Sequence, residues 1–384
     1  MKRKRKLWLL SLLIGSLALI PAGGCAYADG LEAETGPGID LWQKHRMNLH
    51  AADENDFSDL FTGVKNGEDV PLPQGYTFSE VGTYSYDDLS ADLNKLKTDY
   101  PEMALDSLGK TADGRELYHV VVGNPNAKHK ILVHAGIHAR EYIVSQVAMR
   151  EIGSLLKMQR EDSKYGGKSM KSMLQNCAVH FVPMADPDGI AIVQGGLGCI
   201  GSEALRTSIQ QMMEKDKVTD REKYYKTWKS NARGVNLNKN FDANWQDTND
   251  RKGYPSKDEY KGEAAESEIE SKALADLTRK EHFDQTISYH TQGKVIYWYF
   301  GEGSYVKSAR RLAEVVKRNS DYAISDYYVP NEAGGFKDWA EQKLNIPSVT
   351  IECGIGTSPV PEEQIKEIWD GQKGILPDLL YSYS

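Results

Sequence analysis

The amino-acid sequence predicts an α/β fold with a mostly parallel, mixed central sheet covered by helices on both faces. Short apolar runs of strand length alternate with longer stretches whose apolar residues have helical spacing. That alternation is typical of parallel strands joined by crossover helices. The chain has 384 residues, of which 40% are hydrophobic, so it can bury a core of ordinary size.

The elements are expected in a regular order along the chain. Helical spacing of apolar residues predicts helices at residues 85–100, 141–158, 266–279 and 304–319. Short apolar runs predict strands at residues 117–122, 130–134, 179–183, 286–289 and 348–351. In open sheets of this kind, ligands bind outside the carboxyl ends of the strands, so those ends are where functional residues are expected.

The first 28 residues are typical of a secretory signal peptide. Basic residues Lys2 to Lys6 precede a long apolar run, and Ala26-Tyr27-Ala28 forms an A-x-A cleavage site. Cleavage is therefore expected after Ala28, giving a secreted or extracytoplasmic protein. A lipoprotein acylated at Cys25 is the less favoured alternative.

Residues 29–83 are rich in Gly, Pro, Asp and Glu, and they are expected to form an extended lead-in with one short helix near residues 41–49. The compact domain is expected over residues 84–384. No second long apolar segment follows the signal, so no transmembrane domain is expected after cleavage, and a monomer is expected.

The mature chain is expected to be acidic. Loss of the signal removes five basic and no acidic residues, which changes the formal net charge from −8 to −13. Such a protein lacks the positive surface that nucleic acids require. The remaining cysteines, Cys177, Cys199 and Cys353, allow at most one intramolecular disulfide.

Ionisable side chains follow four of the predicted strands. ILVHAG leads into His138 and Glu141, HFVPMA into Asp186 and Asp188, TISY into His290, and SVTI into Glu352. Polar groups are costly to bury without partners, so their convergence at one edge of the sheet predicts a functional site.

Two imidazoles and one carboxylate are a common zinc set that leaves one coordination position open. His138 and Glu141 alone could be a surface polar pair, whereas His290 at an equivalent strand end favours a site for one Zn²⁺. Zinc lowers the pKa of bound water to about 7, and a carboxylate must then move the proton to the leaving amine. Glu352 is the candidate for this general base, with a structural ion pair as the alternative.

The loop WKSNARGVNLNKNFDANW, residues 228–245, carries two lysines, one arginine and several asparagines. These groups could bind a substrate carboxylate and polarise a scissile carbonyl. A solvated loop with asparagines at turn positions is the alternative.

Taken together, the motifs resemble those of the zinc carboxypeptidase family that includes carboxypeptidase A. The matching segments are HAREY, ADPDG, WKSNARGVNLNKNF, YKGEAAESE, SYHTQG, and AGGFKDW followed by TIECG, over about residues 84–384. The resemblance implies an α/β/α sandwich, zinc on His138, Glu141 and His290, and Glu352 as the base.

It also implies that Asn238 and Lys239 hold the carboxylate of the departing residue, that Arg140 contacts the substrate, and that Lys229 polarises the carbonyl. Lysine at position 239 departs from the family's usual arginine, which binds carboxylates through a planar fork. Pro330 stands where many members carry a capping tyrosine.

Lys337 falls where the family places the residue at the floor of the pocket for the departing side chain. A lysine there is expected to select a departing residue with a carboxylate of its own, such as diaminopimelate. The alternative is that Lys337 points to solvent beside Asp338.

The phrases HTQGKVIYW and WKSNARGVNLN are most similar to bacterial members that cut the γ-D-glutamyl to meso-diaminopimelate bond of peptidoglycan stem peptides. The expected function is thus a secreted zinc metallopeptidase acting on a peptide or muropeptide. Two alternatives stay open: a general carboxypeptidase that trims peptides, and a non-catalytic cell-wall binding protein on the same scaffold.

Overall fold

The computed structural model describes residues 70–327 and 329–384. Its main sheet has eight strands in the order β1-β2-β6-β3-β7-β10-β8-β9. The strands are β1 (Ala104–Lys110), β2 (Glu116–Val122), β3 (His129–Ala135), β6 (Cys177–Val182), β7 (Gln285–His290), β8 (Val295–Tyr297), β9 (Ala323–Ser325) and β10 (Ser348–Glu352). Strands β6, β3, β7 and β10 run parallel in the middle of the sheet, with antiparallel pairs on either side. The predicted α/β fold on a mixed sheet is confirmed.

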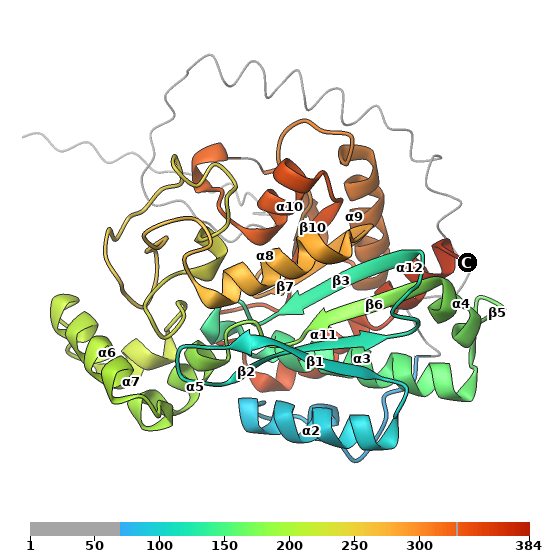
Figure 1. Ribbon diagram of the computed structural model, residues 1–384, viewed down its shortest axis with the longest axis horizontal. Helices are drawn as coiled ribbons and strands as arrows, with labels where there is room; N and C mark the ends of the chain where they lie inside the picture. Colours follow the sequence, from blue (N-terminus) through green and yellow to red (C-terminus); the bar gives the residue numbers. More distant parts are fainter. Residues whose placement is uncertain (1–69, 328) are drawn as a thin grey trace, which may run out of the picture. The chain divides into compact units, whose positions relative to one another are not determined.

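Helices cover both faces of this sheet (Figure 1). The described α-helices are α2 (Tyr86–Asp99), α3 (Ile143–Glu161), α4 (Met170–Asn176), α5 (Pro187–Gly195), α6 (Glu203–Lys215), α7 (Arg221–Lys226), α8 (Ile269–Glu281), α9 (Val306–Ser320), α10 (Phe336–Leu344), α11 (Ile365–Gln372) and α12 (Ile375–Ser382). A separate two-stranded ribbon joins β4 (Lys164–Tyr165) and β5 (Lys168–Ser169). Helices α3, α9 and α11 pack together on one face, and α8 and α10 lie on the other.

The helix predicted at residues 141–158 begins two residues later, at Ile143. A short 3-10 turn, Ala139–Glu141, occupies its expected start. The tighter turn carries the chain from β3 into α3, and it includes one of the expected zinc ligands.

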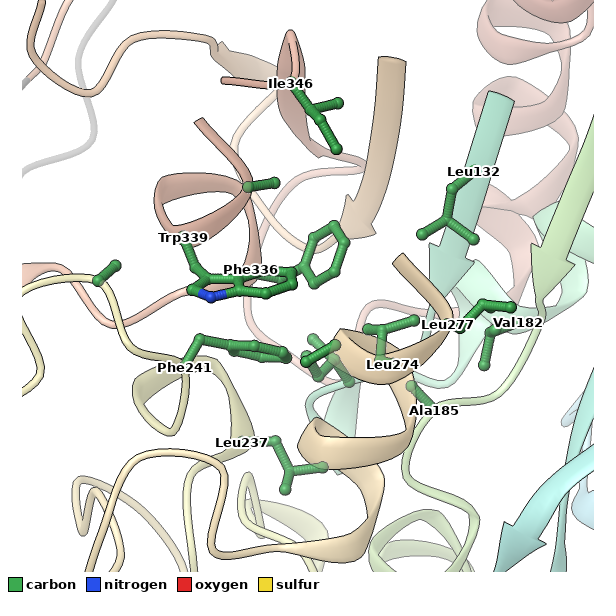
Figure 2. Close-up of a cluster of buried hydrophobic side chains, with 14 of the residues drawn as sticks. Leu132, Val182, Ala185, Leu237, Phe241, Leu274, Leu277, Phe336, Trp339 and Ile346 are labelled. Atoms are coloured by element: carbon green, nitrogen blue, oxygen red, sulfur yellow. The ribbon is translucent and has the colours of Figure 1, made fainter. Parts of the chain in front are cut away.

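A buried cluster on the α8 and α10 face supports the loop expected to bind substrate. Figure 2 shows Phe241, Phe336 and Trp339 beside one another, with Leu237 close by. The ring centroids of Phe241 and Phe336 are 5.4 Å apart in an edge-to-face arrangement, which stabilises by about 0.5–1.5 kcal/mol beyond burial. Because Leu237 and Phe241 flank residues 238–240, this packing fixes the position of Asn238 and Lys239.

The segment before α2 is packed against the domain. Phe78 is fully buried, Asp92 accepts hydrogen bonds from the backbone N–H groups of Thr77 and Phe78 at 3.0 and 2.9 Å, and Arg150 Nε donates to the Phe78 carbonyl at 2.8 Å. The packed part of the chain therefore includes residues N-terminal to Tyr84.

The predicted signal peptide, Cys25 and the helix expected near residues 41–49 lie outside the described residues. Within residues 70–327 and 329–384, no helix has the length and hydropathy needed to cross a membrane. The thiols of Cys177 and Cys353 are buried and that of Cys199 is exposed, and all three are free.

A buried histidine pair between β2 and β6 predicts that stability depends on pH. His119 Nε2 and His180 Nδ1 are 3.0 Å apart, and burial lowers the pKa of His119 to about 4 and that of His180 to about 3. Both values lie below the unfolded value of about 6.5, so the unfolded state binds more protons between these limits. The free energy of unfolding is expected to fall as the pH drops from about 6.5 towards 4, by up to about 1.4 kcal/mol per pH unit for each histidine.

Urea unfolding between pH 5 and 8 checks this prediction. The double variant His119→Leu/His180→Leu removes both partners together, so it should be nearly neutral at pH 8 and lose part of the acid dependence. Identical pH slopes for the two proteins would show that the pair does not control acid stability.

Candidate active site

The candidate site lies at the carboxyl ends of three adjacent parallel strands. β3 pairs with β7, and β7 pairs with β10, so their ends reach the same edge of the sheet. His138 follows β3, whereas His290 and Glu352 are the last residues of β7 and β10. His290 and Glu352 are Cα partners in the parallel register. The register therefore brings together residues far apart in the sequence.

The expected zinc ligands converge on one point. Glu141 Oε1 lies 2.9 Å from His138 Nδ1, and Glu141 Oε2 lies 3.0 Å from His290 Nδ1. The three residues are buried, and their ligand atoms all lie within 4.8 Å of one another. The backbone N–H of Thr291 donates to Glu141 Oε2 at 3.2 Å and helps to orient the carboxylate.

The hydrogen bonds around His138 test whether this set fits a cation. The backbone N–H of Asn238 donates to Asn236 Oδ1, so this same oxygen, 3.1 Å from His138 Nε2, must be an acceptor. His138 Nε2 therefore carries the hydrogen. Burial lowers the pKa of His138 to about 3, so the imidazole is neutral and its Nδ1 lone pair faces a carboxylate oxygen. Two acceptors that face each other in a buried site fit a shared metal ion, and this donor set suits zinc.

Glu352 is half-buried beside this set. Burial raises the pKa of its carboxyl to about 7, although His290, Lys229 and Arg140 act in the opposite direction. A carboxyl group in that range can exchange a proton near neutral pH, as a general base must.

Two basic residues border the site. The Lys229 carbonyl accepts a hydrogen bond from the backbone N–H of Ala139 at 3.3 Å, which holds the 228–245 loop against the turn of the zinc ligands. The positive charge of Lys229 lowers the pKa of both His138 and Glu352. Arg140 also lowers the pKa of Glu352, and its carbonyl accepts a hydrogen bond from Ser358 Oγ at 3.3 Å.

Asn238 and Lys239 follow directly from the turn that contacts His138. Asn238 Oδ1 accepts from the backbone N–H of Phe336 at 3.1 Å, which orients the amide. Lys239 Nζ is bound within the protein, at 2.6 Å from Glu259 Oε2 and 3.2 Å from the Asn249 carbonyl.

Lys337 is buried rather than solvent-exposed. Its Nζ lies 2.6 Å from Asp338, 3.1 Å from Glu341 and 3.3 Å from the Tyr299 carbonyl. These partners match the three donors of an ammonium group, so a substrate carboxylate at this lysine would have to displace one of them. A role for Lys337 in selecting the departing side chain stays a prediction.

The polar residues after β6 have local structural roles. Asp186 Oδ1 accepts from the backbone N–H of Gly189 at 2.9 Å and caps α5. Asp188 accepts from Thr111 and Arg115, each at 2.8 Å. His134 is a fully buried core histidine, and its Nε2 lies 2.6 Å from Ser288 Oγ.

Sequence reasoning missed Asn236 and Glu259. Asn236 contacts His138 across 98 positions of the chain, and Glu259 reaches Lys239 from a turn 20 positions away. The only available signal was the density of asparagines in VNLNKN, which did not distinguish a residue that contacts a zinc ligand from one in an ordinary turn.

Pro330, at the position of the family's capping tyrosine, opens a short 3-10 turn. Tyr328, the nearby tyrosine two residues before it, lies outside the described residues.

Comparisons with known proteins agree with this geometry. A model of the zinc carboxypeptidase family matches residues 89–373. Gamma-D-glutamyl-L-diamino acid endopeptidase 1 of Lysinibacillus sphaericus is 30% identical over 299 residues, which cover 78% of this chain and 72% of that protein. Mast cell carboxypeptidase A of Homo sapiens is 26% identical over 294 residues, covering 71% and 62% respectively.

A solved structure shares the fold. Bovine thrombin-activatable fibrinolysis inhibitor aligns with a TM-score of 0.59 at 17% identity, over 80% of this chain and 98% of that one. The family match spans the positions of His138, Glu141, His290 and Glu352. The chain therefore belongs to the zinc carboxypeptidase family and is a metallopeptidase whose cofactor is zinc.

Proposed function

We propose that this protein is a secreted zinc peptidase that hydrolyses the γ-D-glutamyl to diaminopimelate bond of peptidoglycan stem peptides. The convergence of His138, Glu141 and His290 beside Glu352 supports the hydrolysis. The similarity to a γ-D-glutamyl-L-diamino acid endopeptidase over most of both chains supports the substrate class.

Each residue has a distinct role in this proposal. His138, Glu141 and His290 hold one zinc ion, which when bound supplies a Lewis acid for the attacking water and the scissile carbonyl. The Glu352 carboxylate accepts a proton from the attacking water and delivers it to the nitrogen of the departing amine. Lys229 and Arg140 place positive charge where the carbonyl oxygen becomes negative.

Asn238 and Lys239 bind the departing side of the substrate. The Asn238 amide is oriented by its bond to Phe336, so its Nδ2 is the donor that it offers. General trimming of C-terminal residues is the second candidate function, which the similarity to mast cell carboxypeptidase A favours.

Mass spectrometry of digests tests the proposal. The chain from residue 29 onward, loaded with zinc, is incubated with γ-D-glutamyl-linked stem peptides and with ordinary α-linked peptides. The proposal expects fragments that begin at diaminopimelate, and no fragments after exhaustive chelation. Intact stem peptides alongside trimmed α-linked peptides would favour the general carboxypeptidase instead.

A further inference from the structure

We propose that Glu259 neutralises Lys239, so that the site accepts departing residues whose α-carboxyl group is in a peptide bond and does not require a free C-terminal carboxylate. This inference rests on the proposed function, because it assigns the departing side of the substrate to Asn238 and Lys239. It names Glu259 as a specificity-determining residue that selects endopeptidase over carboxypeptidase action.

The two side chains form a close ion pair. Lys239 Nζ lies 2.6 Å from Glu259 Oε2, and the exposed fractions of the side chains are 16% and 31%. Burial acts to raise the pKa of Glu259, but the hydrogen bond and charge of Lys239 outweigh it and the pKa is lowered. Glu259 is thus ionised, and the Lys239 ammonium that would bind a substrate carboxylate is already paired with the Glu259 carboxylate.

The backbone at Glu259 is held in an unfavourable conformation. Its φ is +65°, and the backbone N–H of Tyr260 donates to the Asp258 carbonyl at 3.0 Å, so Glu259 is at the centre of a tight turn. For a residue other than glycine, a positive φ raises the conformational energy by roughly 1–2 kcal/mol. Such strain concentrates at functional sites. The turn points the carboxylate at Lys239.

The same turn borders the candidate active site. The Tyr260 carbonyl accepts from the backbone N–H of Asn236 at 2.8 Å, and the Lys257 carbonyl accepts from that of Lys229, also at 2.8 Å. The charge of Lys229 contributes to the low pKa of Glu259 as well as to that of His138. The turn at Glu259 therefore packs against the loop segment that contains Asn236, Asn238 and Lys239.

The consequence concerns charge. An unpaired lysine at this position favours a free carboxylate by a charge-assisted hydrogen bond, whereas a lysine paired with glutamate has no net charge to offer. A free substrate carboxylate would also be repelled by Glu259. A departing residue whose α-carboxyl group is in a peptide bond carries no charge there, so it loses no binding energy by the pairing of Lys239. Cleavage within a stem peptide requires such a residue to be accepted.

The test uses two peptides that differ only at the α-carboxyl group of the departing residue, which is free in one and amidated in the other. The ratio of kcat/KM for the free acid to that for the amide is measured in each protein. The wild type is expected to give a ratio within about threefold of one. Glu259→Gln keeps the size of the side chain and removes its charge, so the ratio should rise about tenfold or more, mainly through KM.

Two controls isolate the ion pair. Asp258→Asn changes the net charge equally at the neighbouring position, where the carboxylate pairs with Lys257, and it should leave the ratio unchanged. The double variant Glu259→Gln/Lys239→Gln should lose the gain, because the cation that the first change frees is absent.

Three results would overturn the inference: a wild type that already prefers the free acid tenfold or more, an unchanged ratio in Glu259→Gln, or an equal rise in Asp258→Asn. The first of these results is measured on the wild-type protein, so it does not depend on whether any variant folds. Failure of the proposed substrate can be distinguished from failure of this inference. If the γ-D-glutamyl bond is not cleaved, the same comparison of free acid and amide can be made with an α-linked peptide.

Discussion

The variant Glu352→Gln is expected to reduce kcat by at least ~10²-fold, the usual contribution of general-base catalysis. Glutamine has the shape of glutamate but accepts no proton at neutral pH. Glu352 is the last residue of β10 and the Cα partner of His290, so the substitution leaves the backbone ladder intact. Zinc content should stay at one ion per chain, because Glu352 is not among the three ligands.

Steady-state kinetics with zinc analysis of the same sample measure both quantities. Glu363→Gln makes the same chemical change at an exposed position and should retain wild-type activity. A Glu352→Gln enzyme within threefold of wild type would assign this residue to a structural ion pair and leave the base unidentified.

The variant His290→Ala is expected to abolish activity and zinc retention while the protein stays folded. It removes one of two imidazoles from the set, and a carboxylate with a single imidazole holds zinc much more weakly. The strand itself is secured by backbone pairing of β7 with β3 and β10. Within the described residues, His290 Nε2 has no hydrogen-bond partner to lose.

Zinc stoichiometry after dialysis, together with circular dichroism, separates the two effects. His129→Ala, at the opposite end of β3, is the matched control and should keep both zinc and activity. Activity of His290→Ala that survives exhaustive chelation would exclude His290 from the zinc site.

The strands that the sequence predicts are the buried ones. β2, β3, β6, β7 and β10 are largely buried, and each contains apolar residues that mark it in the sequence. All of these except β2 are parallel strands of the sheet centre, which are covered on both faces. β1 was missed because its residues are half-buried or exposed. β8 and β9 have three residues each, which is too short for a periodicity to be detected.

The same reasoning explains which site residues were predictable. His290 and Glu352 end buried strands, and His138 and Glu141 come shortly after one. The parallel register brings these strand ends to the same edge of the sheet. Asn236 and Glu259 depend instead on the path of the loop between α7 and α8, where contacts are set by turns. No periodicity specifies such a path, so local sequence alone does not predict the partners of Lys239.

One titration tests the zinc-dependent peptidase most directly. Metal-free protein receives zinc in steps while hydrolysis of a peptide that the holoenzyme cleaves is followed. Activity should rise in proportion to added zinc and reach its plateau at one equivalent per chain. Full activity before any zinc is added, or no activity at any zinc level, would contradict the assignment of this site to zinc-dependent peptide hydrolysis.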